Sequence, residues 1–214
     1  MGVVNPDSTP DATVPAVVPP RKRPKPGERR TQILQVLAGM LEQPGADRIT
    51  TAALAAKLDV SEAALYRHFA SKAQMFEALI DFIETSVFGM VNQIADNPHP
   101  LPPPGAAARI ASVILQFGEK NPGMARVMVG DALVYENERL TARINQFFDR
   151  IESSLRQVLR SAAEAQGSLT PTVQASAVAS VWVSFIIGRL QRYARSGFKR
   201  LPTEQLDAAL KAIG

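Results

Sequence analysis

Apolar and polar positions from Arg48 to Lys72 (RITTAALAAKLDVSEAALYRHFASK) alternate with the spacing of two short helices separated by a turn. The first helix has a hydroxyl start signal at Thr50 or Thr51, the second has one at Ser61, and Asp59-Val60 interrupts the pattern between them. Two helices this short bury little apolar surface alone. We therefore expect the pair to pack against its flanks and to present its second helix to a partner.

The same periodicity predicts helices over most of the remaining chain and no strands, which makes the expected fold class all-α. A serine-x-x-glutamine capping box starts one helix at Ser71, and prolines make a loop of the segment from Asn97 to Gly105. The other expected helices run over about 27–42, from after 105 to 120, from the Asn121-Pro122-Gly123 break to about 133, over 136–165, from Thr170-Pro171 onward, and over 203–213.

The two longest expected helices of the second half carry the patterns of helix-to-helix packing. Apolar residues in 136–165 alternate three and four apart, as in a heptad repeat. The next helix has a strip of small residues, which are Ser176, Ser180, Ser184 and Gly188. These two helices could form the four-helix surface of a homodimer, although an intrachain core would leave the same pattern. Polar residues interrupt the apolar window 173–190, so we expect a buried helix and no membrane partner.

Charge and composition narrow the possible functions. Ten Lys and Arg stand against five acids between Arg21 and Lys72, whereas the other residues carry fourteen bases and fifteen acids, so the basic excess lies where a polyanion would bind. The chain has no cysteine and only two histidines, His68 and His99, and it lacks a glycine-rich phosphate loop and a nucleophile-and-base set. We expect no metal, no cofactor and no enzymatic activity. The start lacks a secretory signal, so a cytoplasmic location is expected.

Taken in order, these features divide the chain into three parts. Residues 1–26 contain seven prolines and form an expected disordered, proline-rich basic tail. Residues 27–72 form a three-helix head, and residues 73–214 form a larger helical body.

The motif L-Y-R-H-F at 65–69, followed by Ser71-Lys72, resembles the helix-turn-helix of the TetR family. The resemblance implies an N-terminal three-helix DNA-binding domain with its motif at 50–69, a C-terminal helical regulatory and dimerisation domain, and binding to palindromic double-stranded DNA as a homodimer. Asp59 departs from the glycine that is common in this turn, but aspartate tolerates the left-handed conformation.

Carried onto this chain, the resemblance places the third helix in the major groove. The outward residues expected at base edges or nearby phosphates are Ser61, Glu62, Ala63, Ala64 and Arg67. Those expected to hold phosphates are Thr50, Thr51, Tyr66, His68 and Lys72. Without the motif, His68 would be interpreted as an interior histidine.

Four stretches outside the head resemble, more specifically, the nucleoid occlusion factors of that family: 75–84, 117–133, 143–160 and 195–208. This resemblance implies an association with the nucleoid and the division protein FtsZ as a partner, with Phe82, Lys120 and Asn121 as FtsZ-binding residues. Met90 stands where such proteins have a basic residue. Spacing alone favours Phe82 as a core residue of its amphipathic helix.

The alternative is a TetR-type transcriptional repressor that a small apolar ligand releases from its operator. Such sensing needs a pocket with apolar walls and a few polar anchors. The apolar helices of the body could supply one.

Overall fold

The computed structural model describes residues 27–43, 48–97 and 105–213, and within these ranges it contains helices and no strands. The expected tail (1–26), His99 and most of the proline-rich loop lie outside the described residues. The helices are α1 (Glu28–Leu41), α2 (Thr51–Lys57), α3 (Glu62–Tyr66), α4 (Lys72–Ala95), α5 (Gly105–Lys120), α6 (Pro122–Met128), a 3-10 turn η1 (Asp131–Leu133), α7 (Glu138–Ala165), α8 (Pro171–Arg195) and α9 (Leu206–Ile213).

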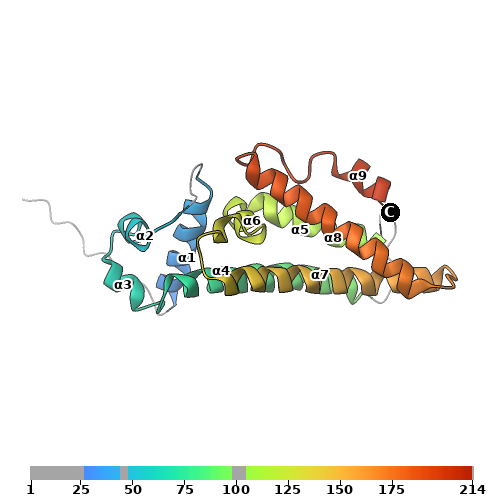
Figure 1. The fold of residues 1–214 in the computed structure, drawn as a ribbon, viewed down its shortest axis with the longest axis horizontal. Coiled ribbons are helices and arrows are strands. Elements are labelled where there is room, and N and C mark those ends of the chain that lie inside the picture. Colours follow the sequence, from blue (N-terminus) through green and yellow to red (C-terminus); the bar gives the residue numbers. More distant parts are fainter. Residues whose placement is uncertain (1–26, 44–47, 98–104, 214) are drawn as a thin grey trace, which may run out of the picture.

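The molecule is elongated, with α1, α2 and α3 forming a head at one end (Figure 1). Helix α4 runs from the head into the body, where it packs against α5 and α7. The long helices α7 and α8 form an antiparallel hairpin along the body, and they make the most extensive helix pair in the fold. The predicted order of a small head, a connecting helix and an all-helical body is confirmed.

Hydroxyl side chains start three helices where the sequence predicts them. The Thr50 hydroxyl oxygen accepts a hydrogen bond from the backbone N–H of Ala53 at 3.1 Å, Ser61 accepts from Ala64 at 3.3 Å, and Ser71 accepts from Gln74 at 3.2 Å. The Gln74 side chain accepts from the Ala70 N–H, one residue earlier than a standard capping box. Asp59 has φ 55°, so it takes the left-handed conformation that the turn requires.

The helix ends show where periodicity misleads. Helix α3 is shorter than the motif suggests, because the Leu65 carbonyl accepts from both His68 and Phe69 and the chain turns tightly there. Helix α6 stops at Met128 rather than near 133, because Gly130 takes φ 78° and only η1 follows. Helix α8 starts at the predicted Thr170-Pro171, but the Thr170 side chain makes no capping hydrogen bond.

Two helices also begin later than expected. Helix α7 starts at Glu138 with Asn137 as its cap, and its side-chain oxygen accepts from the Arg139 N–H at 3.0 Å. Helix α9 starts at Leu206, because Gln205 has φ 52° and separates it from the preceding turn.

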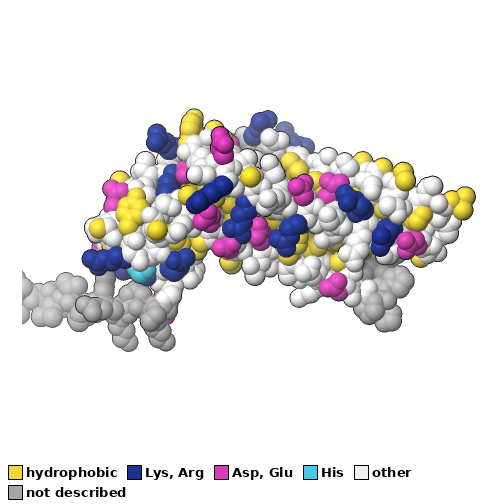
Figure 2. Space-filling view, turned by 60° about the horizontal axis from the view of Figure 1, so that its bottom comes forward, with side chains coloured by type: hydrophobic (Ala, Val, Ile, Leu, Met, Phe, Trp, Pro, Cys, Tyr) yellow, Lys and Arg dark blue, Asp and Glu magenta, His cyan; other side chains and the backbone are white. Residues whose placement is uncertain are grey.

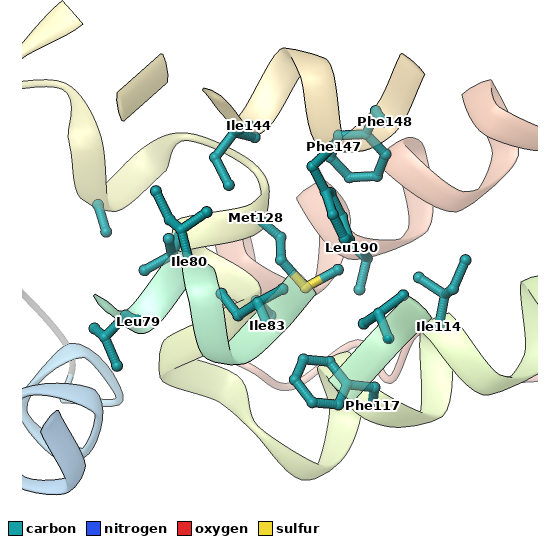
Figure 3. Packing of buried hydrophobic residues seen from close by; sticks show 14 of the residues in the cluster. Leu79, Ile80, Ile83, Ile114, Phe117, Met128, Ile144, Phe147, Phe148 and Leu190 are labelled. Atoms are coloured by element: carbon teal, nitrogen blue, oxygen red, sulfur yellow. The ribbon is translucent and has the colours of Figure 1, made fainter. Parts of the chain in front are cut away.

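A single cluster of buried apolar side chains extends from the head through the body. Ile83 of α4, Phe117 of α5, Met128 of α6 and Leu190 of α8 converge at its centre, beneath Phe147 of α7 (Figure 3). The Phe147 ring packs edge to face on Phe88, with 5.6 Å between the ring centroids. The head therefore rests on the same core as the body.

Helix α8 is apolar on two faces. Among the described helices it alone has the length and composition of a membrane span, and a third of its apolar window is buried. The core helix of a soluble protein can have the same length and composition. Its inner face packs into the body with Trp182, Ile186 and Leu190 buried, as expected. Its outer face exposes Val173 and Val181 beside small residues, so the expectation of a buried helix holds for one side only.

Candidate nucleic-acid interface

Helix α3 presents a mostly polar outer surface. Leu65 is buried and fixes the inner side of the helix. The predicted site residues Ser61, Glu62, Ala63, Tyr66 and Arg67 are exposed, whereas Ala64 and His68 are half-buried. His68 is thus neither fully buried, as an interior histidine would be, nor fully exposed. Figure 2 shows basic side chains gathered at the head end of the molecule.

The hydroxyl groups of the head have structural roles that leave them able to donate. Thr50 and Ser61 use an oxygen lone pair to cap α2 and α3, so their O–H groups remain available as donors. Thr51 instead donates to the Glu62 carboxylate at 2.6 Å. This bond ties α2 to the first turn of α3. It also engages the one acidic side chain among the predicted site residues.

Arg30 of α1 fixes the chain just after α3. Its guanidinium donates to the carbonyl oxygen of His68 and lies 4.1 Å from the centroid of the buried Phe69 ring. The sequence shows only that Arg30 adds charge to the head. Its contact with residues almost forty positions away has no periodic signal and was not predicted.

Lys72, the predicted phosphate ligand at the start of α4, is engaged in the body. Its ammonium group forms an ion pair with Glu136, and the two side chains are 23% and 9% exposed. The Phe76 ring lies 5.7 Å from the same nitrogen. Glu136 precedes α7, so this pair joins the head end of α4 to the hairpin. The sequence pattern does not predict this pairing of Glu136 with Lys72.

A band of paired charges continues along the seam between α4 and α7. Arg143 binds the carboxylates of Asp81 and Glu84, and these contacts raise the pKa of its guanidinium despite partial burial. Arg139 pairs with Glu77 at 2.8 Å. Figure 2 shows basic and acidic side chains intermingled on the body surface. The seam is therefore largely self-neutralised.

The three predicted FtsZ-binding residues lie on neighbouring elements. Phe82 of α4 is 49% exposed, so the interpretation of it as a core residue is wrong. Lys120 is exposed at the end of α5. Asn121 precedes α6, and its side-chain amide donates to the Phe117 carbonyl at 2.8 Å. Met90, at the departing position, is half-buried against the core.

Helix α6 makes direct contact with α1 of the head. A Cβ on Gly123 would lie 2.1 Å from the Ala38 carbonyl oxygen, so the two backbones touch without an intervening side chain. The buried Arg126 donates to the Leu41 carbonyl at 3.4 Å and to Asp131 at 2.7 Å. The segment after Asn121 is thus fastened to the head.

Two surface hollows accompany these features, and both have charged walls. One of about 480 Å³ lies over the α4 and α7 seam, between Glu84, Arg143 and their neighbours. The other, of about 550 Å³, lies at the end of α8. Neither hollow has the apolar walls that an apolar ligand requires. Across the described ranges, no cluster of His, Asp and Glu has the composition of a metal site.

Family models and curated proteins match both halves of the chain. The model of bacterial regulatory proteins of the tetR family matches residues 33–79, and that of the tetracyclin repressor-like C-terminal domain, SlmA-like, matches residues 107–213. Nucleoid occlusion factor SlmA of Photobacterium profundum is 50% identical over 180 residues, which cover 84% of this chain and 90% of that relative. The SlmA of Vibrio cholerae is 49% identical over the same shares of both chains.

Solved structures show the same fold at much lower identity. The TetR family regulator PfmR of Thermus thermophilus has a TM-score of 0.66 at 18% identity, covering 86% of this chain and 94% of its own. The fatty acid degradation regulator FadR of Bacillus halodurans has a TM-score of 0.68 at 13% identity, covering 90% and 96%. Since the SlmA relatives match nearly half of all residues over most of their length, the chain belongs to the nucleoid occlusion factor SlmA family of TetR-type DNA-binding regulators.

Proposed function

We propose that this nucleoid occlusion factor binds palindromic duplex DNA as a homodimer through the outer surface of α3, and that its DNA-bound form acts on FtsZ. The observation that carries the proposal is the exposed, polar outer surface of α3 on a head that shares its core with the body. The exposed Ser180, Val181 and Ser184, near the middle of α8, supply a face for a second copy of the chain.

In this arrangement α3 enters the major groove, where Ser61, Ala63, Ala64 and Arg67 approach base edges and adjacent phosphates. Only apolar contacts, for instance to thymine methyl groups, are open to the two alanines. Two copies of α3 in one dimer lie about 34 Å apart, one turn of duplex, so a palindrome with that half-site spacing is the matching ligand.

Other head residues serve mainly to hold phosphates. The free O–H group of Thr50, the O–H group of Thr51, the Tyr66 hydroxyl, the His68 imidazole and Lys72 supply donors at the edges of the groove. Thr51 has to exchange its bond with Glu62 for one to phosphate, and Lys72 has to leave or share Glu136. The Glu62 carboxylate repels phosphate oxygens. Its role is therefore to orient Thr51 rather than to contact phosphate.

Quantitative binding to duplexes tests this division of roles. Changing Ala63 to serine should alter the preferred base sequence and keep the salt dependence, whereas Arg67→Ala should also flatten the dependence of log K on log salt by about 0.9. Fluorescence anisotropy with the preferred palindrome and a scrambled duplex measures both quantities. If the Ala63→Ser variant kept the original sequence preference, the placement of α3 in the major groove would be wrong.

For FtsZ, we propose a contact surface made of Phe82, Lys120 and Asn121. A phenylalanine ring half exposed on a helix whose other large apolar residues are buried or half-buried is a candidate anchor for a protein partner. Lys120 adds a positive charge at the end of α5. The Asn121 amide keeps one N–H for a partner while the other holds the Phe117 carbonyl.

The packing of α6 on α1 gives a physical route between the two activities. The close approach at Gly123 and the Arg126 bond to α1 join the segment after Asn121 to the head. A change in the position of α1 on DNA would therefore move the start of α6. Coupling through such a packed contact requires no flexible linker.

Phe82→Ala tests the FtsZ surface. Because the ring is half exposed, its removal should leave the fold and DNA affinity unchanged while it abolishes DNA-dependent loss of sedimentable FtsZ filaments. Leu169→Ala, which truncates a fully exposed apolar side chain at the tip of the hairpin, is the control and should act as the unchanged protein. Equal activity of the two variants would exclude Phe82 from the contact.

This proposal locates the protein on the nucleoid, in the cytoplasm. A ligand-released repressor remains the competing function, and it predicts that an apolar effector lowers DNA affinity. A screen of fatty acids and other apolar molecules in the same anisotropy assay distinguishes the two, because the division function predicts no such effect.

A further inference from the structure

Five basic side chains and no acidic one occur between Arg189 and Arg200, at the end of α8 and in the loop that follows. Acidic residues elsewhere in the body balance these five positive charges. The net charge of the whole body therefore does not reveal the local basic cluster. The concentration lies in the body and outside the helix-turn-helix of the head (Figure 1).

Only part of this charge is neutralised. The Arg189 guanidinium donates to the carbonyl of Glu204 at 2.7 Å and lies 5.0 Å from the Phe185 ring centroid. Arg192 reaches the Glu204 carboxylate at 3.4 Å. Within the described part of the chain, Arg195 and Arg200 have no carboxylate at ion-pair distance. Two guanidinium groups are therefore left uncompensated.

The loop after α8 folds back so that these groups meet. Left-handed conformations at Gly197 and Phe198 reverse the chain, and the Phe198 ring packs on Tyr193 with 5.1 Å between centroids. The Ser196 hydroxyl accepts from the backbone N–H of Lys199 at 3.1 Å and of Arg200 at 2.9 Å. These bonds hold Arg200 close to the C-terminal end of α8.

The result is an open hollow of about 550 Å³ with three guanidinium groups on its walls. Its lining consists of Gly188, Gln191, Arg192, Arg195, Ser196 and Arg200. No atom lies within 4 Å of the place where a Gly188 Cβ would be, so the glycine leaves that wall open. A volume of this size lies within the range of small-molecule sites, about 300 to 1,000 Å³.

Stabilisation of the helix end does not account for this arrangement. Cations in the last turn of a helix interact favourably with its dipole, which explains Arg192 and Arg195. That effect fades beyond the last turn, and Arg200 follows the helix by five residues. A loop that returns a third guanidinium to the same hollow indicates a site for an anion.

We propose that this hollow binds a compact polyphosphate anion. Guanidinium groups pair with phosphate oxygens through two parallel hydrogen bonds each, and two or three of them offset much of the negative charge of a di- or triphosphate group. The lining contains no aromatic side chain, so the site has no means of stacking a base and should not distinguish nucleotides. Its concave form suits a compact anion better than the extended backbone of a duplex.

Isothermal titration of the full-length protein with inorganic triphosphate, at constant ionic strength, tests the proposal. We expect one site per chain, and we expect Arg195→Ala combined with Arg200→Ala to weaken binding at least about tenfold, because two charged hydrogen-bonding groups are lost. Arg195→Lys combined with Arg200→Lys keeps both positive charges but loses the paired N–H donors of the guanidinium groups. This variant should therefore bind triphosphate with intermediate affinity.

The matched control is Arg139→Ala combined with Arg160→Ala, which removes two half-exposed arginines of α7 and the same net charge. It should bind triphosphate as the unchanged protein does. Absence of binding by the unchanged protein, or equal weakening in the control, would overturn the proposal. A changed sedimentation coefficient of the Arg195 and Arg200 double variant would also overturn it, because the arginines would then serve contacts between subunits.

Discussion

Glu136 should restrain DNA binding, because it holds the ammonium group that is expected to reach a phosphate. Replacing it by glutamine keeps the shape of the side chain and removes its charge. An exposed ion pair contributes about 0 to 1 kcal/mol. Here the Lys72 and Glu136 side chains are only 23% and 9% exposed, so the pair should lie at the upper end of that range. We therefore expect Glu136→Gln to tighten DNA binding by about 1 kcal/mol, or about fivefold.

The gain should be the same for the preferred palindrome and for a scrambled duplex, because we expect Lys72 to contact phosphate and not base. Fluorescence anisotropy at several salt concentrations measures it. Lys72→Ala should weaken binding to both duplexes and flatten the salt slope by about 0.9. In the Lys72→Ala background, Glu136→Gln should no longer improve affinity, and the double-mutant cycle gives the coupling between the two residues.

Glu138→Gln is the control for general electrostatics. Glu138 is exposed two residues further along the chain, and its removal changes the net charge by the same amount. Its effect on affinity should be less than about twofold, because solvent screens it. If Glu136→Gln left affinity unchanged or lowered it, or if its gain persisted without Lys72, Glu136 would not restrain DNA binding through Lys72.

Three further predictions concern the fold. Gly123→Ala places a Cβ 2.1 Å from the Ala38 carbonyl oxygen. Urea denaturation should therefore show that the free energy of unfolding falls by about 2 kcal/mol or more. An unchanged midpoint would exclude the close packing of α6 on α1. Ser71→Ala removes the cap of α4 and should cost about 1 kcal/mol in the same assay; no loss would mean that the cap is dispensable. Burial, with the charges of Glu119 and Glu42, raises the pKa of Tyr193, which favours its neutral form in the folded state. The stability that this provides is complete below the unfolded pKa of about 10 and is lost as pH rises through the higher folded pKa. Tyr193→Phe should therefore remove this part of the alkaline loss of stability. Identical profiles of stability against alkaline pH for the two proteins would contradict this prediction.

Features set by neighbouring residues could be predicted from the sequence. The hydroxyl caps at Thr50, Ser61 and Ser71 lie where the pattern places them, because a cap needs only a residue type at a fixed offset. The left-handed turn at Asp59 follows from a local conformational preference in the same way.

Features set by contacts between distant residues could not. Glu136 lies 64 residues from Lys72, and no periodic pattern relates the two. Phe82 illustrates a second limit, because α4 buries apolar side chains on a broad face and the spacing does not show which one lies outside it. The hollow at the end of α8 depends on a loop that reverses at Gly197 and Phe198, a geometry that sequence spacing does not convey.

We propose that the DNA-bound protein acts on FtsZ through its body. The most direct test is sedimentation of FtsZ filaments with the full-length protein, in the presence and absence of a palindromic duplex that the protein itself selects from random-sequence DNA. We expect the amount of sedimented FtsZ to fall when protein and palindrome are both present, and to fall much less with the protein alone. Unchanged sedimentation in both conditions, under salt where the duplex is fully bound, would contradict it.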